Sequence, residues 1–487
     1  MTSPAPPLRP RELLLAAILI AVVGAGLMRA AGAFDLIDRP LWLDEVLTWL
    51  LVTDPSWAHM FAALRGAVDT NPPGLHVLMR IFCAPFGDGP APMRVFAVVS
   101  IYLALLGVYV GLRRAFGVLP AAAGVAALAS NELVVFHAFE ARFYGPLLAA
   151  SVWAAVLLQA MQSTRRTVLV GAAAGIVSII LCTLHYFGVF SLLCVVGAIL
   201  LFDYNPLKRK LMLLLPAGAG LIALAACLPM FLAQRTGLAT TTWVDPTDMP
   251  RLRAFLLDVL SVWPLLLLAA VWGATRLFRG PSSEKPPSWR ASAPLASLGA
   301  VAVIVVIFSI VVQPALIDRY AIAAVVINSV LAASIVSRVR VAIQAVMVIG
   351  LIVLTLLPGP ASTGTGWKMR DSPLVRRTER WKTFELNLQD LTADLRSIPP
   401  QRALLFTHRQ ALYPAAWFAP EMRDRMFYYD PLIPPGTPGK HHDIYEADMA
   451  RRVEFFYGWP KVLDPNRVNS IKHYDLIEGD KPPKRIR

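Results

Sequence analysis

The sequence predicts a polytopic α-helical membrane protein with about eleven transmembrane helices and a small α/β domain near its C-terminus. Apolar residues make up 56% of the 487 positions and charged residues only 16%, whereas about a quarter of a soluble domain is charged. Apolar runs of roughly 17–23 residues recur as far as residue 358, and each suits a bilayer core about 30 Å thick. Lipid must therefore solvate most of this chain.

The predicted spans begin close to the N-terminus. Basic residues precede the run 12–34, as in a signal peptide, but the run is too long for the apolar part of a signal and predicts an uncleaved first helix. The later predicted spans are 94–112, 118–137, 143–161, 168–184, 187–202, 211–232, 254–275, 295–313, 320–336 and 342–358.

Basic residues between the spans determine the predicted topology. They mark the loop ends at Arg9 and Arg11, Arg113 and Arg114, Arg165 and Arg166, Lys208 to Lys210, Arg276 and Arg279, and Arg338 and Arg340. Eleven spans with a cytoplasmic N-terminus place every one of these clusters in the cytoplasm, as the positive-inside rule requires. The net charge of +14 thus indicates a multi-pass protein of the inner (plasma) membrane and no nucleic-acid partner.

The first external loop, about residues 35–93, is predicted to lie on the periplasmic face. Residues 72–86 within it are apolar, but they number only about 15 and include Arg80, so we expect an in-plane or re-entrant helix and no twelfth span. Residues 55–65 predict a second interfacial helix in the same loop.

The C-terminal tail, residues 361–487, is predicted to be an extracytoplasmic (periplasmic) domain, because an odd number of spans precedes it. It is polar, rich in proline and tyrosine, and contains one strand-like run at 403–407. About 125 residues suffice for a small α/β domain. A linker around 358–366 would separate it from the membrane domain, residues 1–360.

The carboxylates of Asp44 and Glu45 stand side by side where the first span ends. A charged side chain at the bilayer centre costs about 2.5–3.5 kcal/mol, and less at an interface, so such a pair is informative. One interpretation is an interfacial helix cap, in which Asp44 accepts free N–H groups. The other is a catalytic site, with Asp44 as general base and Glu45 orienting a substrate group or interacting with a cation.

Two further segments on this predicted face carry polar side chains. His76 follows the two prolines of TNPPGLH and lies one turn into the in-plane helix, where it either packs or lines a pocket. Glu140, Arg142 and Tyr144 lie in FEARFYGP, at a predicted helix junction. An arginine there suits a phosphate, because its several donors grip the oxygens; an interfacial Arg142–Glu140 pair is the alternative.

Later segments add three more candidates. His185 and Tyr186 lie in LHYFG, and Arg319 and Tyr320 lie in LIDRYAI. A membrane-interface aromatic belt is the alternative for Tyr320. Arg251 lies in the loop before the eighth span, where it either holds an anionic lipid headgroup or merely solvates the loop.

Several classes of mechanism find no support in the sequence. No nucleotide-binding glycine loop, HExxH motif or GxSxG motif occurs in a sequence context that would support its function. The four cysteines lie inside apolar runs and lack the spacing of metal ligands. A membrane transporter or lipid flippase is the main alternative. It predicts polar groups at mid-depth and on both faces, whereas here they gather on one predicted face.

The ordered motifs together resemble the GT-C glycosyltransferases. They are the DE pair after the first span, NPPGLH, ARFY, LHYF and DRY, and they resemble most the bacterial relatives of the protein O-mannosyltransferases and of the aminoarabinose transferases that modify lipid A. The resemblance covers residues 12 to about 358 and extends loosely to the tail. It departs at Asn71, where histidine or lysine is more usual, and this leaves the sugar and the acceptor open.

The resemblance implies an inverting enzyme that transfers a sugar from a polyprenyl-phosphate donor to a hydroxyl of a lipid, glycan or protein on the periplasmic face. By motif position it makes Asp44 the catalytic base, places Arg142 and Tyr144 in the donor pocket, and places Arg319 and Tyr320 at a late donor-side motif. Because such enzymes release a lipid monophosphate, the resemblance implies no metal and no other cofactor.

Overall fold

The chain forms two compact units in the computed structural model. The described residues are 10–162, 167–202, 206–237, 244, 247–260, 262–279, 289–356, 388–433, 441–468, 471, 473–477 and 484–486. Unit 1 comprises Met1–Asp35, Arg94–Ala226 and Pro246–Arg377, and unit 2 comprises Leu36–Met93, Cys227–Asp245 and Thr378–Arg487.

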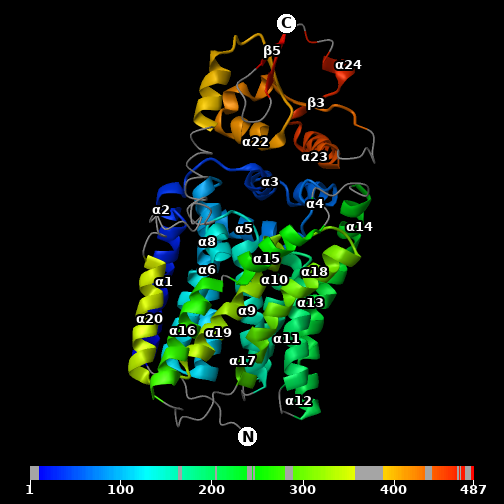
Figure 1. Ribbon diagram of the computed structural model, residues 1–487. Helices are drawn as coiled ribbons and strands as arrows, with labels where there is room; N and C mark the ends of the chain where they lie inside the picture. Colours follow the sequence, from blue (N-terminus) through cyan, green and yellow to red (C-terminus); the bar gives the residue numbers. More distant parts are fainter. Residues whose placement is uncertain are drawn as a thin grey trace. The chain divides into compact units, whose positions relative to one another are not determined.

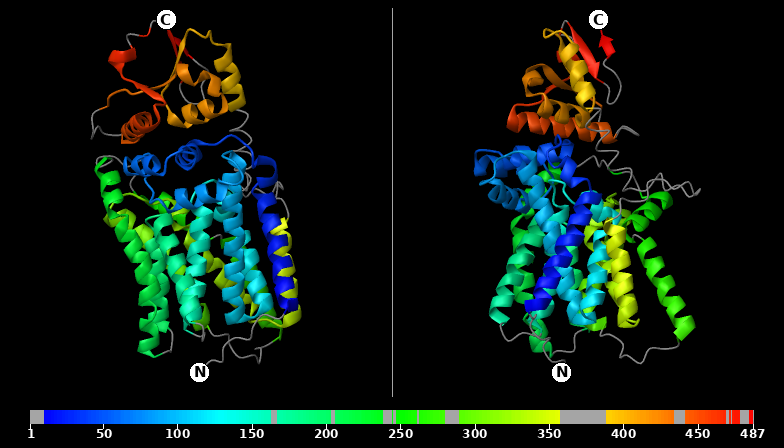
Figure 2. Two further views of the ribbon diagram at one scale, coloured as in Figure 1. Left: turned by 180° about the vertical axis from the view of Figure 1, so that it is seen from behind. Right: turned by 90° about the vertical axis from the view of Figure 1, so that its left-hand side faces the viewer.

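Unit 1 is a bundle of α-helices with a few short 3₁₀ segments, η (Figure 1). Its elements are α1 (Pro10–Ala30), α6 (Pro90–Phe116), α7 (Val118–Ala129), α8 (Glu132–His137), α9 (Tyr144–Met161), α10 (Thr167–Leu184), α11 (Gly188–Phe202), α12 (Leu207–Leu211), α13 (Leu214–Ala226), α15 (Met249–Leu260), α16 (Val262–Arg279), α17 (Trp289–Ala296), η1 (Ser297–Gly299), α18 (Ala300–Val311), η2 (Asp318–Val325), α19 (Val326–Val336) and α20 (Val341–Leu356). The first and last of these helices, α1 and α20, lie side by side (Figures 1 and 2).

The apolar helices confirm the prediction of a polytopic helical membrane protein. Among the described residues, seven helices are long and apolar enough to cross a membrane. Shorter apolar helices at Val118–Ala129, Gly188–Phe202 and Val341–Val353 also belong to the bundle. The count of eleven spans stays a prediction. Helix α9 is the most enclosed of the seven, since 83% of its span is buried.

An ion pair fixes the relative direction of α1 and α6. Arg113 in the last turn of α6 donates to Glu12 in the first turn of α1 at 2.5 Å. The two helices therefore run in opposite directions, and the chain between them begins and ends at the same end of the bundle. The apolar helix in that loop, α5 (Gly74–Cys83), has 10 residues, or about 15 Å of length, too short for a span. Both observations support the prediction of a non-spanning helix.

Unit 2 contains a small α/β domain, which confirms the class predicted for the tail. Its sheet has the order β3-β2-β1-β4-β5, with parallel pairs except between β4 and β5. The strands are β1 (Ala403–Phe406), β2 (Met426–Tyr429), β3 (Lys461–Leu463), β4 (Tyr474–Ile477) and β5 (Lys484–Ile486). Helices connect the parallel strands, as this geometry requires. The strand predicted at 403–407 is β1.

The helices of the first external loop pack onto this domain. The helices of unit 2 are α3 (Leu43–Val52), α4 (Trp57–Arg65), α5, α14 (Leu228–Gly237), α22 (Arg409–Phe418), η4 (Pro420–Arg425), α23 (His441–Tyr457) and α24 (Pro465–Val468), while α2 (Ala33–Leu36) and the first turn of α6 cross the boundary between the two units. Arg452 on α23 donates to the carbonyl of Gly66 at 2.7 Å, and the Tyr457 hydroxyl donates to Asp54 at 3.1 Å. Burial and the neighbouring Asp54 charge raise the pKa of Tyr457, so it stays a donor.

This grouping differs from the predicted division, in which the first external loop belonged to the membrane domain, residues 1–360. Apolar side chains of α3 and α4 share a core with Tyr413 of α22 and Val453 of α23, and this shared burial unites the loop with the tail. The linker predicted at 358–366 lies outside the described residues.

A buried ion pair joins α22 to α23 in unit 2. Arg409 donates to both carboxylate oxygens of Glu446, at 2.8 and 2.7 Å, and both side chains are almost fully buried. Burial lowers the pKa of Arg409, but the Glu446 charge and its hydrogen bonds outweigh this and raise the pKa above its usual range. The guanidinium is therefore always charged.

Glu446→Gln is expected to destabilise unit 2 by about 3–5 kcal/mol, because it leaves a buried guanidinium without its counter-charge. Thermal unfolding of the purified protein measures this loss. The matched control is Glu421→Gln, which removes an ion pair with Arg396 whose side chains are 55% and 52% exposed and should change stability little. Equal effects of the two variants would contradict the prediction.

Candidate functional site

Unit 1 interrupts its helices at three places that carry polar side chains. Residues 138–143 separate α8 from α9, and residues 185–187 separate α10 from α11. The third interruption is η2, a 3₁₀ segment in which Ala321 leaves helical geometry (φ −103°, ψ 19°). Inside a membrane protein, irregular backbone is tolerated only where protein buries it or where it lines a cavity. The interruptions carry the polar side chains of this unit that the sequence singled out.

Aromatic contacts join the three interruptions. The ring centroid of His185 lies 4.2 Å from that of Phe143 and 5.1 Å from that of Tyr320. The Arg319 guanidinium carbon lies 5.9 Å from the centroid of Tyr144. The Arg142 guanidinium carbon lies 5.7 Å from the centroid of Phe143. We call these residues the arginine–aromatic cluster: Arg142, Phe143, Tyr144, His185, Arg319 and Tyr320.

The carboxylate of Glu140 adjoins this cluster through a histidine. Nδ1 of His137 and Oε2 of Glu140 are 2.6 Å apart, and both side chains are buried. The His137 ring centroid lies 4.2 Å from that of Tyr144, and the Arg142 amide N–H donates to the Glu140 carbonyl at 2.6 Å. Sequence reasoning missed His137, although it lies only three positions before Glu140. The contact orients the carboxylate beside the cluster.

The arginine–aromatic cluster is suited to a phosphate group. Its two guanidinium groups, with Arg142 only 6% exposed, can each donate several hydrogen bonds to phosphate oxygens. Burial strengthens such bonds because the local dielectric constant is low. Helix α9 begins at Tyr144, and its N-cap residue Phe143 makes no side-chain capping bond. A helix N-terminus of this kind favours anions as well.

Helix α3 of unit 2 gives Asp44 and Glu45 different surroundings. The Glu45 carboxylate accepts the N–H of Trp42 at 3.3 Å and lies 3.3 Å from the Arg39 guanidinium, with both charged side chains fully buried. Glu45 therefore caps the N-terminus of α3 with a buried side chain, and Arg39 balances its charge. Asp44 is half-buried in the same first turn.

His76 lies in the interior of unit 2. Its Nε2 is 3.4 Å from a carboxylate oxygen of Asp69, whose other oxygen accepts from Asn71 at 2.6 Å. Gln234 on α14 donates to the carbonyls of Leu64, Asp69 and Asn71 at 2.9, 3.2 and 3.2 Å. These bonds hold the TNPPGLH segment against α14. His76 thus has a packing environment, and its role in a pocket stays a prediction.

The two remaining candidates lie in unit 1. Tyr186 is half-buried directly after His185. Arg251 is exposed on the first turn of α15, where its amide N–H donates to Asp248 at 2.8 Å. Helix α15 packs on η2. Tyr186 and Arg251 therefore lie in elements next to the cluster, and their participation stays a prediction.

Comparison with known proteins identifies the fold. No family model and no curated protein sequence matches the chain. ArnT from Cupriavidus metallidurans bound to undecaprenyl phosphate matches with a TM-score of 0.55 at 13% identity, over 95% of this chain and 92% of that one. The apo state of ArnT gives 0.53 over the same shares. The chain shares its fold with ArnT.

A weaker match is the Archaeoglobus fulgidus oligosaccharyltransferase in the apo form, with a TM-score of 0.47 and 11% identity over 84% of this chain and 64% of that one. The likeness to ArnT confirms the fold that the resemblance of the ordered motifs implied. At 13% identity it establishes the fold, and the chemistry must be argued from the residues themselves.

Gly188→Ala is expected to destabilise the fold next to His185. A Cβ at this position would lie 2.1 Å from the backbone carbonyl oxygen of Leu181, so the backbone must shift, at a cost of about 1–3 kcal/mol. Thermal unfolding in detergent measures the effect. The matched control on the same helix is Gly197→Ala, because a Cβ there meets no atom within 4 Å. A stability loss as large in the control would contradict the steric explanation.

Proposed function

We propose that this protein is a glycosyltransferase that transfers a sugar from a polyprenyl-phosphate donor to the hydroxyl of a lipid, glycan or protein acceptor. The observation that carries the proposal is the arginine–aromatic cluster, which places a buried guanidinium, Arg142, and a half-buried one, Arg319, in an apolar helical bundle. A lipid-linked phosphate matches this environment, because its tail needs apolar surroundings and its headgroup needs cations. The GT-C fold, shared with ArnT bound to undecaprenyl phosphate, supports the same assignment.

The proposed reaction is an inverting displacement at the anomeric carbon. Asp44 removes the proton from the acceptor hydroxyl, and the acceptor oxygen attacks the anomeric carbon from the face opposite the phosphate. The bond between that carbon and the phosphate oxygen breaks, and polyprenyl phosphate leaves with the electron pair. Arg142 and Arg319 stabilise the growing charge on the leaving phosphate, as preorganised cations do in transition states.

Glu45, Glu140, Tyr144 and Tyr320 are assigned supporting roles, and that of Glu140 is to hold His137 beside Tyr144. Glu45 holds the start of α3 through Trp42 and Arg39, so that it positions Asp44 in the first turn. Tyr144 lies against the Arg319 guanidinium and thereby limits its rotamers, and Tyr320 lies beside the ring of His185. The predicted topology assigns this chemistry to the periplasmic face of the inner membrane.

We expect the reaction to need no metal ion. The leaving group is a monophosphate ester, and two guanidinium groups neutralise it without a divalent cation. Sugar transfer in isolated membranes should therefore continue at an unchanged rate after addition of EDTA. Loss of transfer that Mg²⁺ or Mn²⁺ restores would contradict this expectation.

Binding of the released carrier tests the proposed function directly. The purified protein is titrated with undecaprenyl phosphate, and its thermal stability is followed, because a ligand that binds the folded state raises the unfolding temperature. Undecaprenol, which lacks the phosphate, is the control. We expect stabilisation by the phosphate form alone. In parallel, mass spectrometry of envelope glycolipids and glycoproteins from cells with and without the protein should reveal one missing sugar; an unchanged envelope would refute the transferase assignment.

A further inference from the structure

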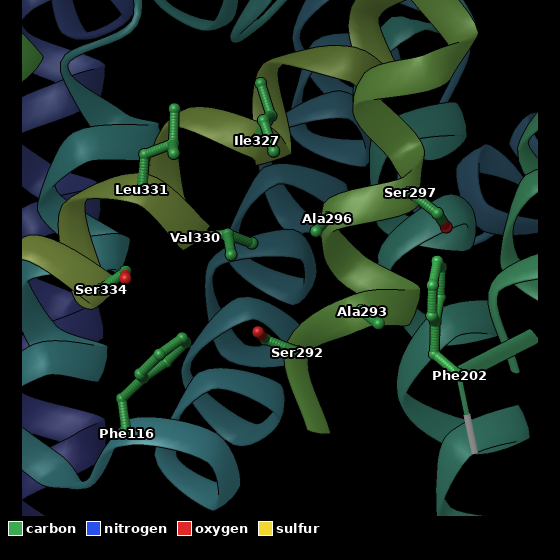
Figure 3. A pocket seen from close by; sticks show the side chains of 10 residues that line it. All are labelled: Phe116, Phe202, Ser292, Ala293, Ala296, Ser297, Ile327, Val330, Leu331 and Ser334. Carbon is green, nitrogen blue, oxygen red and sulfur yellow. The ribbon is translucent and has the colours of Figure 1, made fainter. Parts of the chain in front are cut away.

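A groove of about 360 Å³ opens on the flank of the helical bundle of unit 1. Small side chains of α17 and the start of η1 lie between larger side chains of α6, α11 and α19 (Figure 3). The lining residues are Ser292, Ala293, Ala296, Ser297, Phe116, Phe202, Ile327, Val330, Leu331 and Ser334. Phe202 and Leu331 are 41% and 40% exposed, so the groove faces the surroundings of the bundle.

The lining suits a flexible apolar chain. Ligand pockets begin at about 300 Å³, so this groove has room for one hydrocarbon chain and not for a whole lipid. The Ser297 hydroxyl does not demand a polar ligand, because it already donates to the carbonyl of Pro294 at 2.8 Å. Phenyl rings of Phe116 and Phe202 border the small residues of α17 on two sides (Figure 3).

Basic residues stand at the same end of the lining helices. Arg114 precedes Phe116 on α6, Arg290 precedes Ser292 on α17, and Arg338 follows Ser334 by about one turn. Beside α11, the ammonium group of Lys210 donates to the carbonyl of Leu200 at 2.7 Å. Arg114 and Arg290 are thus on lining helices within one turn of a lining residue, Arg338 follows the end of α19, and Lys210 on α12 contacts the end of α11. Such juxtamembrane cations attract anionic lipid headgroups.

We propose that the groove binds one acyl chain of an anionic phospholipid, with its phosphate held by these basic residues. Charge complementarity identifies the occupant, since an apolar slot and the cations at one end of its lining helices match the two parts of such a lipid. The groove is separate from the arginine–aromatic cluster: Arg319 precedes α19 on η2, whereas Ser334 lies in the last turn of α19. The proposal therefore does not depend on the proposed function.

Lipid titration tests the proposal. The purified, delipidated protein receives phosphatidylglycerol, phosphatidylcholine or undecaprenyl phosphate, and the unfolding temperature and native mass spectra are recorded. We expect phosphatidylglycerol to raise the unfolding temperature and to remain bound as a single molecule, and phosphatidylcholine to do neither. Equal stabilisation by both phospholipids would overturn the proposal.

Two variants locate the binding. Ala296→Phe fills the groove and should abolish the effect of phosphatidylglycerol. Its control is Val303→Phe on α18, at a position that is 59% exposed, which should keep the effect. If undecaprenyl phosphate alone loses its effect in Ala296→Phe, the groove holds the donor tail and the proposal is wrong.

A charge variant keeps the test valid if Ala296→Phe does not fold. Arg290→Gln leaves the groove open and should weaken phosphatidylglycerol binding about fivefold, the factor expected for one cation at a lipid surface. The control is Arg29→Gln, which removes an exposed arginine from the last turn of α1. Equal affinity for phosphatidylglycerol in Arg290→Gln and in the unaltered protein would refute the assignment of the headgroup.

Discussion

Asp44→Asn is expected to lower the rate of sugar transfer by about 10²–10⁴-fold, the usual contribution of a positioned general base. The amide has the shape of the carboxylate, but it does not accept the proton of the acceptor hydroxyl. Binding of undecaprenyl phosphate should be unchanged, because the donor phosphate is assigned to the arginines of unit 1. The measurement is the initial accumulation of the sugar-modified envelope product, by mass spectrometry, in cells whose only copy is the variant.

Glu45→Gln is the informative comparison for Asp44→Asn. Glu45 is fully buried beside Arg39, so its loss should reduce the amount of folded protein, with transfer per folded molecule less affected. The two variants thereby distinguish the adjacent carboxylates: Asp44→Asn should change the transfer rate, and Glu45→Gln should change the stability. Near-native transfer by Asp44→Asn would show that the base has been assigned to the wrong residue.

Arg142→Gln is expected to weaken the binding of undecaprenyl phosphate by about 10–100-fold. A hydrogen bond to a charged group contributes about 1.5–3 kcal/mol, and Arg142 is 6% exposed, so water does not replace it readily. Arg142→Lys should restore little of the affinity, because an ammonium group lacks the planar fork of donors that grips two phosphate oxygens. Thermal shift titration with undecaprenyl phosphate measures both variants.

The control for Arg142 is Arg29→Gln, which removes a positive charge at an exposed position of the same unit. Its effect should be small and should fade at high salt, because solvent and ions screen exposed charges. If Arg142→Gln and Arg29→Gln weaken binding equally, the interaction is a general attraction to positive charge. That outcome would contradict the assignment of the donor phosphate to the arginine–aromatic cluster.

Composition and periodicity were sufficient to predict the helical bundle. Lipid solvates apolar runs of this length whatever their neighbours are, so the class follows from local sequence. The short strand at Ala403–Phe406 and the helix Trp57–Arg65 also follow from local patterns. The grouping of the first loop with the C-terminal domain does not, because it rests on contacts between residues as distant as Asp54 and Tyr457.

The sequence allowed single residues of the candidate site to be predicted, but not their contacts with one another. Arg142, His185 and Arg319 stand out because polar side chains interrupt apolar segments. The ring contacts that connect them, those of His185 with Phe143 and Tyr320, depend on how three separate helix interruptions pack together. His137 escaped notice because the contact that recruits it, with Glu140, arises from the bend after α8.

The sequence by itself determined that this chain is a lipid-solvated helical protein whose chemistry-bearing side chains lie at the ends of its apolar segments. That much follows from transfer free energies, which depend on residue type and run length alone. The tertiary structure decided which of two adjacent carboxylates is enclosed, Glu45 and not Asp44, and which aromatic rings join Arg142 to Arg319. It also decided where a groove remains between helices. These are properties of contacts between distant segments, and packing geometry fixes them only after the helices have assembled.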